Sequence, residues 1–420
     1  MRGNIHMENN QYSVLYDISL IFNVHNKTYT VDSSNVTSVS MLHNYDTLTF
    51  PICRFKLECD LSLIQDLLDY PDEIEIVCSL DANIYQMFDN SSELNVVGGA
   101  KNMSLCLKGY IENKNIPTNV MDQYDNGIKR ETDLNVSRKV PIDIYGYHQN
   151  FIYGLKRLSE AVYHNITIQD IIEDALTRQS IQDFKIQVIE QQTKFDQVLI
   201  PNLDIIQMLA YFDQYYGMYS TGAQVYGDLD NILYITSTDT SHVNNSILGI
   251  RVADYKSDSD MGGLQKNADD TYTMNVLSAN VSVLTETDIE RILNSDSVNA
   301  VNVNTEDVQS ASLKELYPAT TLISGKEGTP NILHKHTNPF VATMNAARVK
   351  EKITQVDLSC NGMDIGSLHI DTRINLMFDN ALRGADMSGI YRMCYANHVL
   401  TPLTGQLFTS TSTFRLCKNN

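Results

Sequence analysis

The stretch that decides the fold is "GIYRMCYANHVLTPLTGQLFTSTSTFRLC", Gly389–Cys417, which contains two strand-like runs. Successive side chains of a strand point to opposite faces. In the second run, one face carries Phe408, Phe414 and Leu416. The other face carries Thr409, Thr411, Thr413 and Arg415. We expect the aromatic face to be buried and the threonine face to be wet, as in the wall of a pore or the outside of a barrel.

The first run, from Ile390 to Val399, has no clearly polar face. With strict alternation, one face holds Ile390, Arg392, Cys394, Ala396 and His398, and the other holds Tyr391, Met393, Tyr395, Asn397 and Val399. A strand of an isolated antiparallel barrel has one solvated face. We therefore expect one face to lie inside a barrel and the Tyr391, Met393 and Tyr395 face to pack against another domain or subunit.

Period-two patterning of this kind also fills the first third of the chain. Between Tyr12 and Tyr147, short runs such as "FPICRFKLEC" and "MSLCLKGYIEN" alternate and are separated by clusters of Asn, Asp, Gly and Pro. Such a series predicts an antiparallel barrel or sandwich. The segment Leu61–Tyr70 is the exception and predicts a short helix. After a long polar region, runs such as "RVKEKITQVDLSC" and "SLHIDTRINLMF" predict barrel strands again.

The period changes near Phe151. In "TIQDIIEDAL", the apolar residues recur at helical spacing, and Thr167 with Asp170 predicts an N-terminal cap. A second helix follows, with an apolar stripe of Ile205, Leu209, Phe212 and Tyr216. We expect Asn202 to cap this second helix and Gly217 to end it. The runs "FKIQVI" and "NILYI" supply a sheet on which the helices can lie.

The whole pattern predicts an α+β chain that is mainly β, with two β-barrel domains linked by an α+β insert. A chain of 420 residues is long enough for two or three such domains. We place the first barrel at residues 1–150, the insert at 151–245 and the second barrel, with long polar loops, at 246–420.

The charge of the chain limits its partners. The formal net charge is −20, so a phosphate-binding groove is disfavoured and DNA that meets the protein is expected to slide past. The N-terminus lacks the pattern of a secretion signal, and no apolar run is long enough to span a bilayer, so we expect no membrane insertion. Seven cysteines without a C-x-x-C pair indicate free thiols.

Motifs that carry chemistry are missing from the sequence. It contains no phosphate-binding G-x-x-x-x-G-K-[ST], no G-x-S-x-G and no H-E-x-x-H. His334 with His336, and Asp258 with Asp260, are the best metal candidates, but each pair lacks further ligands. His398 is interpreted as a hydrogen-bonded core residue. We therefore expect no cofactor, no metal, no catalytic residue and no hydrolytic activity.

The order of elements resembles the tail hub (baseplate hub) proteins of bacteriophages and the hub part of type VI secretion spikes. In those proteins a strand reading roughly G-x-Y is followed by a His-containing end, a turn and a closing strand with an aromatic residue. Gly389, Tyr391, His398, Gly405 and Phe408 stand in those places here. The middle of the chain is also similar, with a helix, a strand, a helix that ends in Gly and a hairpin.

This resemblance implies a structural protein of the virion, located at the phage tail tip or baseplate and made in the host cytoplasm. Its barrels would be similar to tail-tube subunits, and a homotrimer would place six of them in a ring. The ring would adapt a sixfold tail tube or distal tail protein above to a threefold central spike or tail-tip protein below, and DNA would pass through its lumen without specific binding. The interface candidates are Gly389, Tyr391, Met393, Tyr395, His398 and Phe408.

Two other classes of protein remain open on the sequence alone. A receptor-binding or distal tail protein shares β architecture and would carry an exposed aromatic cleft for sugars. A cell-wall-degrading enzyme of a tail tip would clear peptidoglycan. Its paired carboxylates could hide among the many acidic residues, because their geometry is invisible in a sequence.

Overall fold

The computed structural model describes residues 11–44, 50–87, 94–111, 139–219, 222–227, 231–237, 247–252, 263–266, 272–276, 279–283, 297–301, 308–312, 354–368, 372–378, 387–404 and 406–418. The metal candidates His334, His336, Asp258 and Asp260 lie outside these residues, as does Gly405.

Most strands belong to one sheet that closes into two rings. The first ring runs through β1, β5, β7, β8, β4, β3, β22, β23 and back to β1, each hydrogen-bonded to the next. Its strands are β1 (Gln11–Val24), β3 (Val36–Asn44), β4 (Ile52–Asp60), β5 (Ile74–Met87), β7 (Met103–Ile111), β8 (Lys139–His148), β22 (Gly389–Thr404) and β23 (Leu407–Lys418).

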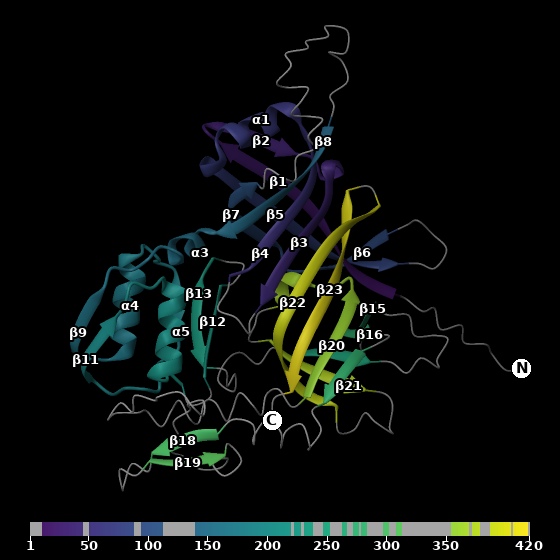
Figure 1. The fold of residues 1–420 in the computed structure, drawn as a ribbon. Coiled ribbons are helices and arrows are strands. Elements are labelled where there is room, and N and C mark those ends of the chain that lie inside the picture. The colour runs from purple at the N-terminus through teal and green to yellow at the C-terminus, as the bar shows by residue number, and fades with distance from the viewer. Residues whose placement is uncertain are drawn as a thin grey trace, which may run out of the picture.

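The second ring reuses three of these strands. It runs through β1, β15, β16, β14, β21, β22, β23 and back to β1. Its additional strands are β14 (Ile247–Val252), β15 (Gly263–Lys266), β16 (Tyr272–Val276) and β21 (Arg373–Phe378). The two barrels therefore share β1, β22 and β23, and Figure 1 shows β22 and β23 crossing the molecule between them in yellow. The predicted fold class, mainly β with two barrels and an α+β insert, is confirmed.

Smaller elements complete the barrels. The predicted helix near Leu61 is present as α1 (Leu61–Asp69), and its Asp66 carboxylate accepts a bond of 2.8 Å from Lys27 on β2. The remaining elements are β2 (Lys27–Val31), η1 (Ser33–Asn35), η2 (Pro71–Glu73), β6 (Leu94–Gly99), β17 (Ala279–Val283), β20 (Thr354–Asn361), η5 (Ile365–Ser367) and the pair β18 (Ser297–Val301) and β19 (Val308–Ser312).

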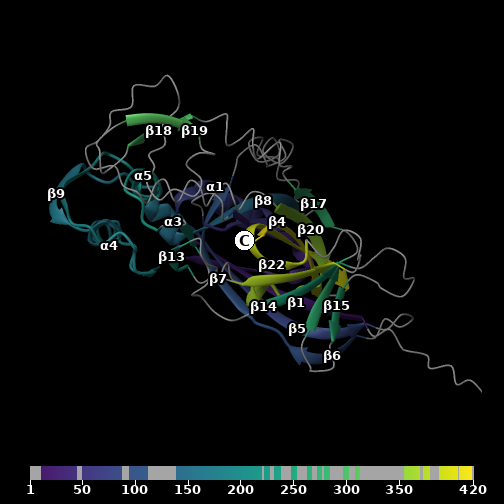
Figure 2. The same cartoon turned by 90° about the horizontal axis from the view of Figure 1, so that it is seen from below.

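The insert lies to one side of the barrels (Figures 1 and 2). The two runs predicted to supply a sheet contribute β10 and β13, which pair in parallel, and β9 pairs with β11. Its elements are α3 (Gln149–Gly154), β9 (Ala161–Ile166), α4 (Ile168–Arg178), β10 (Phe184–Ile186), β11 (Phe195–Ile200), α5 (Ile205–Tyr215), β12 (Ala223–Gly227) and β13 (Leu233–Ser237).

The helix caps show one confirmed prediction and one wrong one. Thr167 caps α4, because its hydroxyl accepts the Asp170 N–H at 3.2 Å. Asp204, and not Asn202, caps α5: its carboxylate accepts the Gln207 N–H at 2.7 Å, and the Gln207 side chain accepts the Asp204 N–H at 3.4 Å. This reciprocal pair satisfies two orphan donors, which Asn202 lies too far upstream to do. Gly217, at a φ of 67°, follows the end of α5 as predicted.

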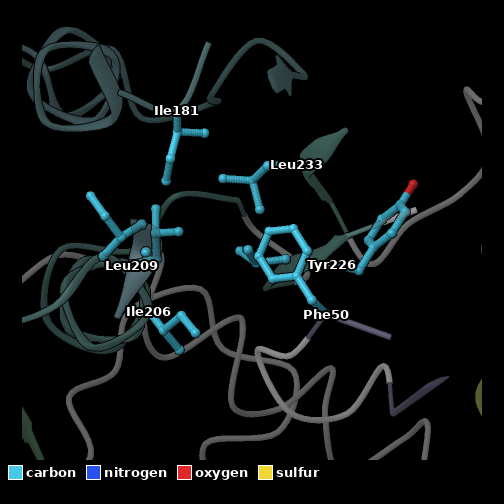
Figure 3. Close-up of a pocket in the computed structure, with 9 residues that line it drawn as sticks. Phe50, Ile181, Ile206, Leu209, Tyr226 and Leu233 are labelled. Atoms are coloured by element: carbon cyan, nitrogen blue, oxygen red, sulfur yellow. The ribbon is translucent and has the colours of Figure 1, made fainter. Parts of the chain in front are cut away.

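The barrels and the insert place aromatic residues in each other's hydrophobic cores. Phe50, which precedes β4, is buried in the core of the insert, next to Ile206, Leu209 and Leu233 (Figure 3). Tyr226 of β12 belongs to the core of the barrels. The predicted limits at residues 150 and 245 stay a prediction, but the insert has a hydrophobic core of its own into which the barrel places Phe50.

Candidate functional site at the shared wall of the barrels

Four neighbouring strands, β3, β22, β23 and β20, form a wall that extends across both barrels. Their register places one set of residues side by side on the outer face, since directly opposed residues point the same way. We call this set the neutral wall: Ser40, Leu42, Asn44, Asp357, Ser359, Asn361, Tyr395, Asn397, Val399, Thr401, Thr409, Thr411, Thr413 and Arg415.

The neutral wall is polar but carries no net charge. Hydroxyl and amide groups dominate it, and Thr411 donates to the Asn361 side chain at 3.0 Å. Its only charged members, Asp357 and Arg415, pair across β20 and β23 with a distance of 2.9 Å between carboxylate and guanidinium. Because the whole chain has a net charge of −20, this neutrality is a local property of the wall. Such a surface is wetted by water and neither attracts nor repels phosphate strongly.

The opposite face of the same strands is the core. Phe408, Phe414 and Leu416 are at most 1% exposed, while Thr411, Thr413 and Arg415 are exposed. The predicted division of the last strand into a buried aromatic face and a wet threonine face is therefore confirmed.

The predicted alternation of β22 is wrong at one point. Met393 pairs with Leu416 and Tyr395 pairs with Arg415, so Cys394 is an extra residue in a β-bulge. A bulge shifts the following side chains to the opposite face. Tyr391 and Met393 therefore point into the core of the barrels, and Tyr395 joins the neutral wall.

The expectation that the start of β22 lacks a wet face is confirmed for residues 391–394 but is wrong for Ile390, which is 39% exposed. Tyr391, Arg392, Met393 and Cys394 are all buried. For Tyr391 and Met393 the covering atoms belong to the chain's own core, so their burial needs no second subunit.

The other interface candidates lie on β22 and β23, but they do not share one face of these strands. Gly389 begins β22 at a φ of 147°, a conformation that side-chain-bearing residues rarely adopt. Phe408 lies in the core near the start of β23. Tyr395 is half-buried and pairs in register with both Asn44 and Arg415. Of the candidates, Tyr395 is thus the one whose side of the strand belongs to the neutral wall.

His398 is a hydrogen-bonded core residue, as the sequence indicated. It is 2% exposed, and its Nδ1 lies 2.8 Å from the Ser412 hydroxyl. Its ring packs edge-on against Phe414 and against His43 of β3, with centroids 5.6 and 5.7 Å away. Burial, with a smaller contribution from His43, holds the pKa of His398 well below its usual value.

The lowered pKa of His398 leads to a prediction about the stability of the fold in acid. The unfolded chain takes up the proton near pH 6.5 and the folded chain resists it, so the folded state is destabilised as the pH falls through that value. Denaturant unfolding at pH 7 and pH 5 should show a loss that His398→Gln reduces by up to about 1.4 kcal/mol per pH unit. Equal pH dependence in the two proteins would contradict the prediction.

A loop that connects two strands of the barrels was not predicted from the sequence. Residues 362–368, the junction loop, lie between β1 and β23: the Gly362 N–H donates to Ser410 O at 2.8 Å, and Gly362 O accepts the Val14 N–H at 2.9 Å. The buried Tyr16 hydroxyl donates to Met363 O at 2.6 Å and accepts the Ile365 N–H at 2.8 Å. The signal in the sequence was Ser410 on an otherwise mainly aromatic face, because its hydroxyl accepts the Met363 N–H at 3.0 Å.

Within the described ranges, His, Cys, Asp and Glu side chains form no group of three that could hold a metal ion. All seven cysteines are free thiols, as expected, and all except Cys106 are buried. Of the helices that the structure describes, none combines the length and hydropathy needed to cross a lipid bilayer.

This arrangement of two barrels and an insert is the fold of phage tail proteins. The structure is similar to the tail protein from Neisseria meningitidis MC58, with a TM-score of 0.51, 12% identity and coverage of 96% of this chain and 97% of that one. It is also similar to the lidded Francisella PdpA-VgrG complex, with a TM-score of 0.50 and 10% identity. This match covers 99% of this chain but only 53% of that one. The 43 kDa tail protein of prophage MuSo2 from Shewanella oneidensis matches at a TM-score of 0.49 and 9% identity, covering 95% and 98%.

Residues 8–415 match the family model of the Bacteriophage PBS1 gene 109 protein, and the chain belongs to this family. The resemblance to phage tail proteins is therefore confirmed: the chain belongs to a bacteriophage family and has the fold of a tail protein. No curated protein sequence is significantly similar to it.

Proposed function

We propose that the protein is a structural hub of the phage baseplate, in which three copies form a ring around the path of the DNA. The observation that carries this proposal is the neutral wall, which extends over both barrels without a break because β22 and β23 belong to both. A chain with two barrels supplies six barrels when it trimerises, which matches a threefold to a sixfold neighbour.

The chemistry of the neutral wall suits the inner surface of such a ring. Lysine-rich or arginine-rich surfaces bind DNA through phosphate contacts and release of counterions. The one guanidinium of the neutral wall, Arg415, is held by Asp357, so the wall offers DNA no uncompensated positive charge. We therefore place this face toward the lumen, where DNA passes without being retained.

The proposed partners follow from the ring. A tail tube or distal tail protein would contact one rim, and a central spike or tail-tip protein the other. Of the interface candidates, Tyr395 lies on the neutral wall, so we place it toward the lumen and not at a rim. The protein would act by assembly alone, without catalysis.

The oligomeric state tests the proposal. We expect purified full-length chain, alone or with its tail partners, to give the mass of a trimer by light scattering coupled to size exclusion, and threefold rings by negative-stain imaging. A monomeric particle component with a sugar-binding cleft would favour a receptor-binding protein. Clearing of a peptidoglycan substrate would favour a tail-tip enzyme.

A further inference from the structure

The insert contains a pocket of about 140 Å³ that is distant in sequence from the neutral wall. It lies between the segment that precedes β9, the C-terminal end of α4 and the end of β11. Polar groups around it come from Arg157, Ser159, Arg178 and Gln179. Its apolar lining includes Leu158, Ala175 and Ile200, each of which is at most 5% exposed.

The two arginines of the pocket differ in whether they form an ion pair. Arg178 pairs with Asp174 at 2.6 Å and lies 5.7 Å from the centre of the Tyr163 ring, while the Tyr163 hydroxyl donates to the same Asp174 carboxylate at 2.5 Å. Both contacts use the same oxygen of the Asp174 carboxylate, Oδ2. Arg157 is exposed and forms no ion pair with any residue that the structure describes. The pocket therefore holds one uncompensated positive charge.

The helix end beside the pocket does not cancel this charge. The last carbonyls of α4 are occupied by backbone donors: Ala175 O accepts from Gln179 at 3.1 Å, and Leu176 O accepts from Ile181 at 3.0 Å. Thr177 O accepts from Ser180 at 3.0 Å. The negative end of the α4 dipole amounts to about half an elementary charge, which reduces but does not cancel the full charge of a guanidinium.

We propose that this pocket binds one oxyanion group, either a carboxylate or a phosphate. A guanidinium presents parallel N–H donors that match two oxygens of such a group, and the Ser159 hydroxyl and Gln179 amide can add further donors. The buried apolar lining strengthens the attraction because it reduces screening by water. The proposal is independent of the hub function, since no residue of the neutral wall takes part.

Calorimetric titration of the full chain at low ionic strength tests the site with two probes. Inorganic phosphate represents a free ion, and N-acetyl-glutamate amide represents a carboxylate side chain of a partner protein. The test variant is Arg157→Gln. The matched control is Lys156→Gln, which makes the same change in charge one residue away, at an ammonium that lies 4.9 Å from the centre of the Tyr153 ring and outside the pocket lining.

We expect Arg157→Gln to weaken binding about tenfold or more and Lys156→Gln to change it less than about threefold. Tighter binding of phosphate assigns the pocket to a free ion, and tighter binding of the glutamate probe assigns it to a partner's carboxylate. Absence of binding by both probes, or equal effects of the two substitutions, would overturn the proposal.

Discussion

Replacing Met393 by Asp is expected to abolish folding of the protein. Met393 is 1% exposed in the core that both barrels share. An unpaired carboxylate there costs several kcal/mol, and about 2 kcal/mol or more of side-chain burial is lost as well. Domains are stable by only about 5 to 15 kcal/mol, so most of the available stability disappears. Expression of the variant followed by circular dichroism and denaturant unfolding measures the effect.

The matched control lies on the opposite face of the neighbouring strand. Thr411→Asp places the same carboxylate on the exposed neutral wall, where water solvates it. The substitution removes the bond to Asn361 and is expected to cost about 1 kcal/mol or less. Equal tolerance of Asp at the two positions would show that the assignment of faces is wrong.

Replacing Gly362 by Ala is expected to destabilise the junction between the barrels by about 2 to 5 kcal/mol. Gly362 has a φ of 70°, which is unfavourable for residues with a Cβ. A Cβ at this position would overlap the Ser13 hydroxyl and lie 3.2 Å from the Ser13 Cα. The backbone has little room to move away, because its N–H and carbonyl are both bonded to the flanking strands.

Thermal and denaturant unfolding measure this effect, and Gly99→Ala is the control. A Cβ at Gly99 meets no atom within 4 Å, and the predicted change is below about 0.5 kcal/mol. If both alanine variants unfold like the wild type, the junction loop does not hold β1 and β23 in the way described.

Local patterns allowed much of the fold to be predicted. The alternation of Phe and Thr in the last strand determines its two faces, because a strand has a period of two residues. Thr167 and Asp170 likewise determine the start of α4 within a few residues. Such features depend only on neighbours in sequence, and for that reason a single chain reveals them.

The sequence predictions were wrong where two local arrangements of the chain fit the sequence equally well. "RMCY" is apolar or aromatic at three of four positions, so an extra residue at Cys394 leaves no trace in the hydrophobic pattern. Asn202 and Asp204 are both favourable cap residues, and only the reciprocal bonds with Gln207 decide between them.

The site itself depends on pairings that no local pattern contains. β3 and β22 meet through Ser40 and Val399, which are far apart in the chain, and the neutral wall exists only because of this contact. Individual threonines of the last strand were predicted to be wet, but their continuity with β3 and β20 follows from the closed topology.

The central claim is that three copies form a ring whose lumen is lined by the neutral wall. A reconstruction of the intact tail tip by electron cryomicroscopy, calculated without imposed symmetry, tests it most directly. The account predicts three copies of the chain around the axis, with Thr411, Thr413 and Tyr395 facing the lumen. Any other copy number, or a neutral wall turned to the outside of the tail, would contradict it.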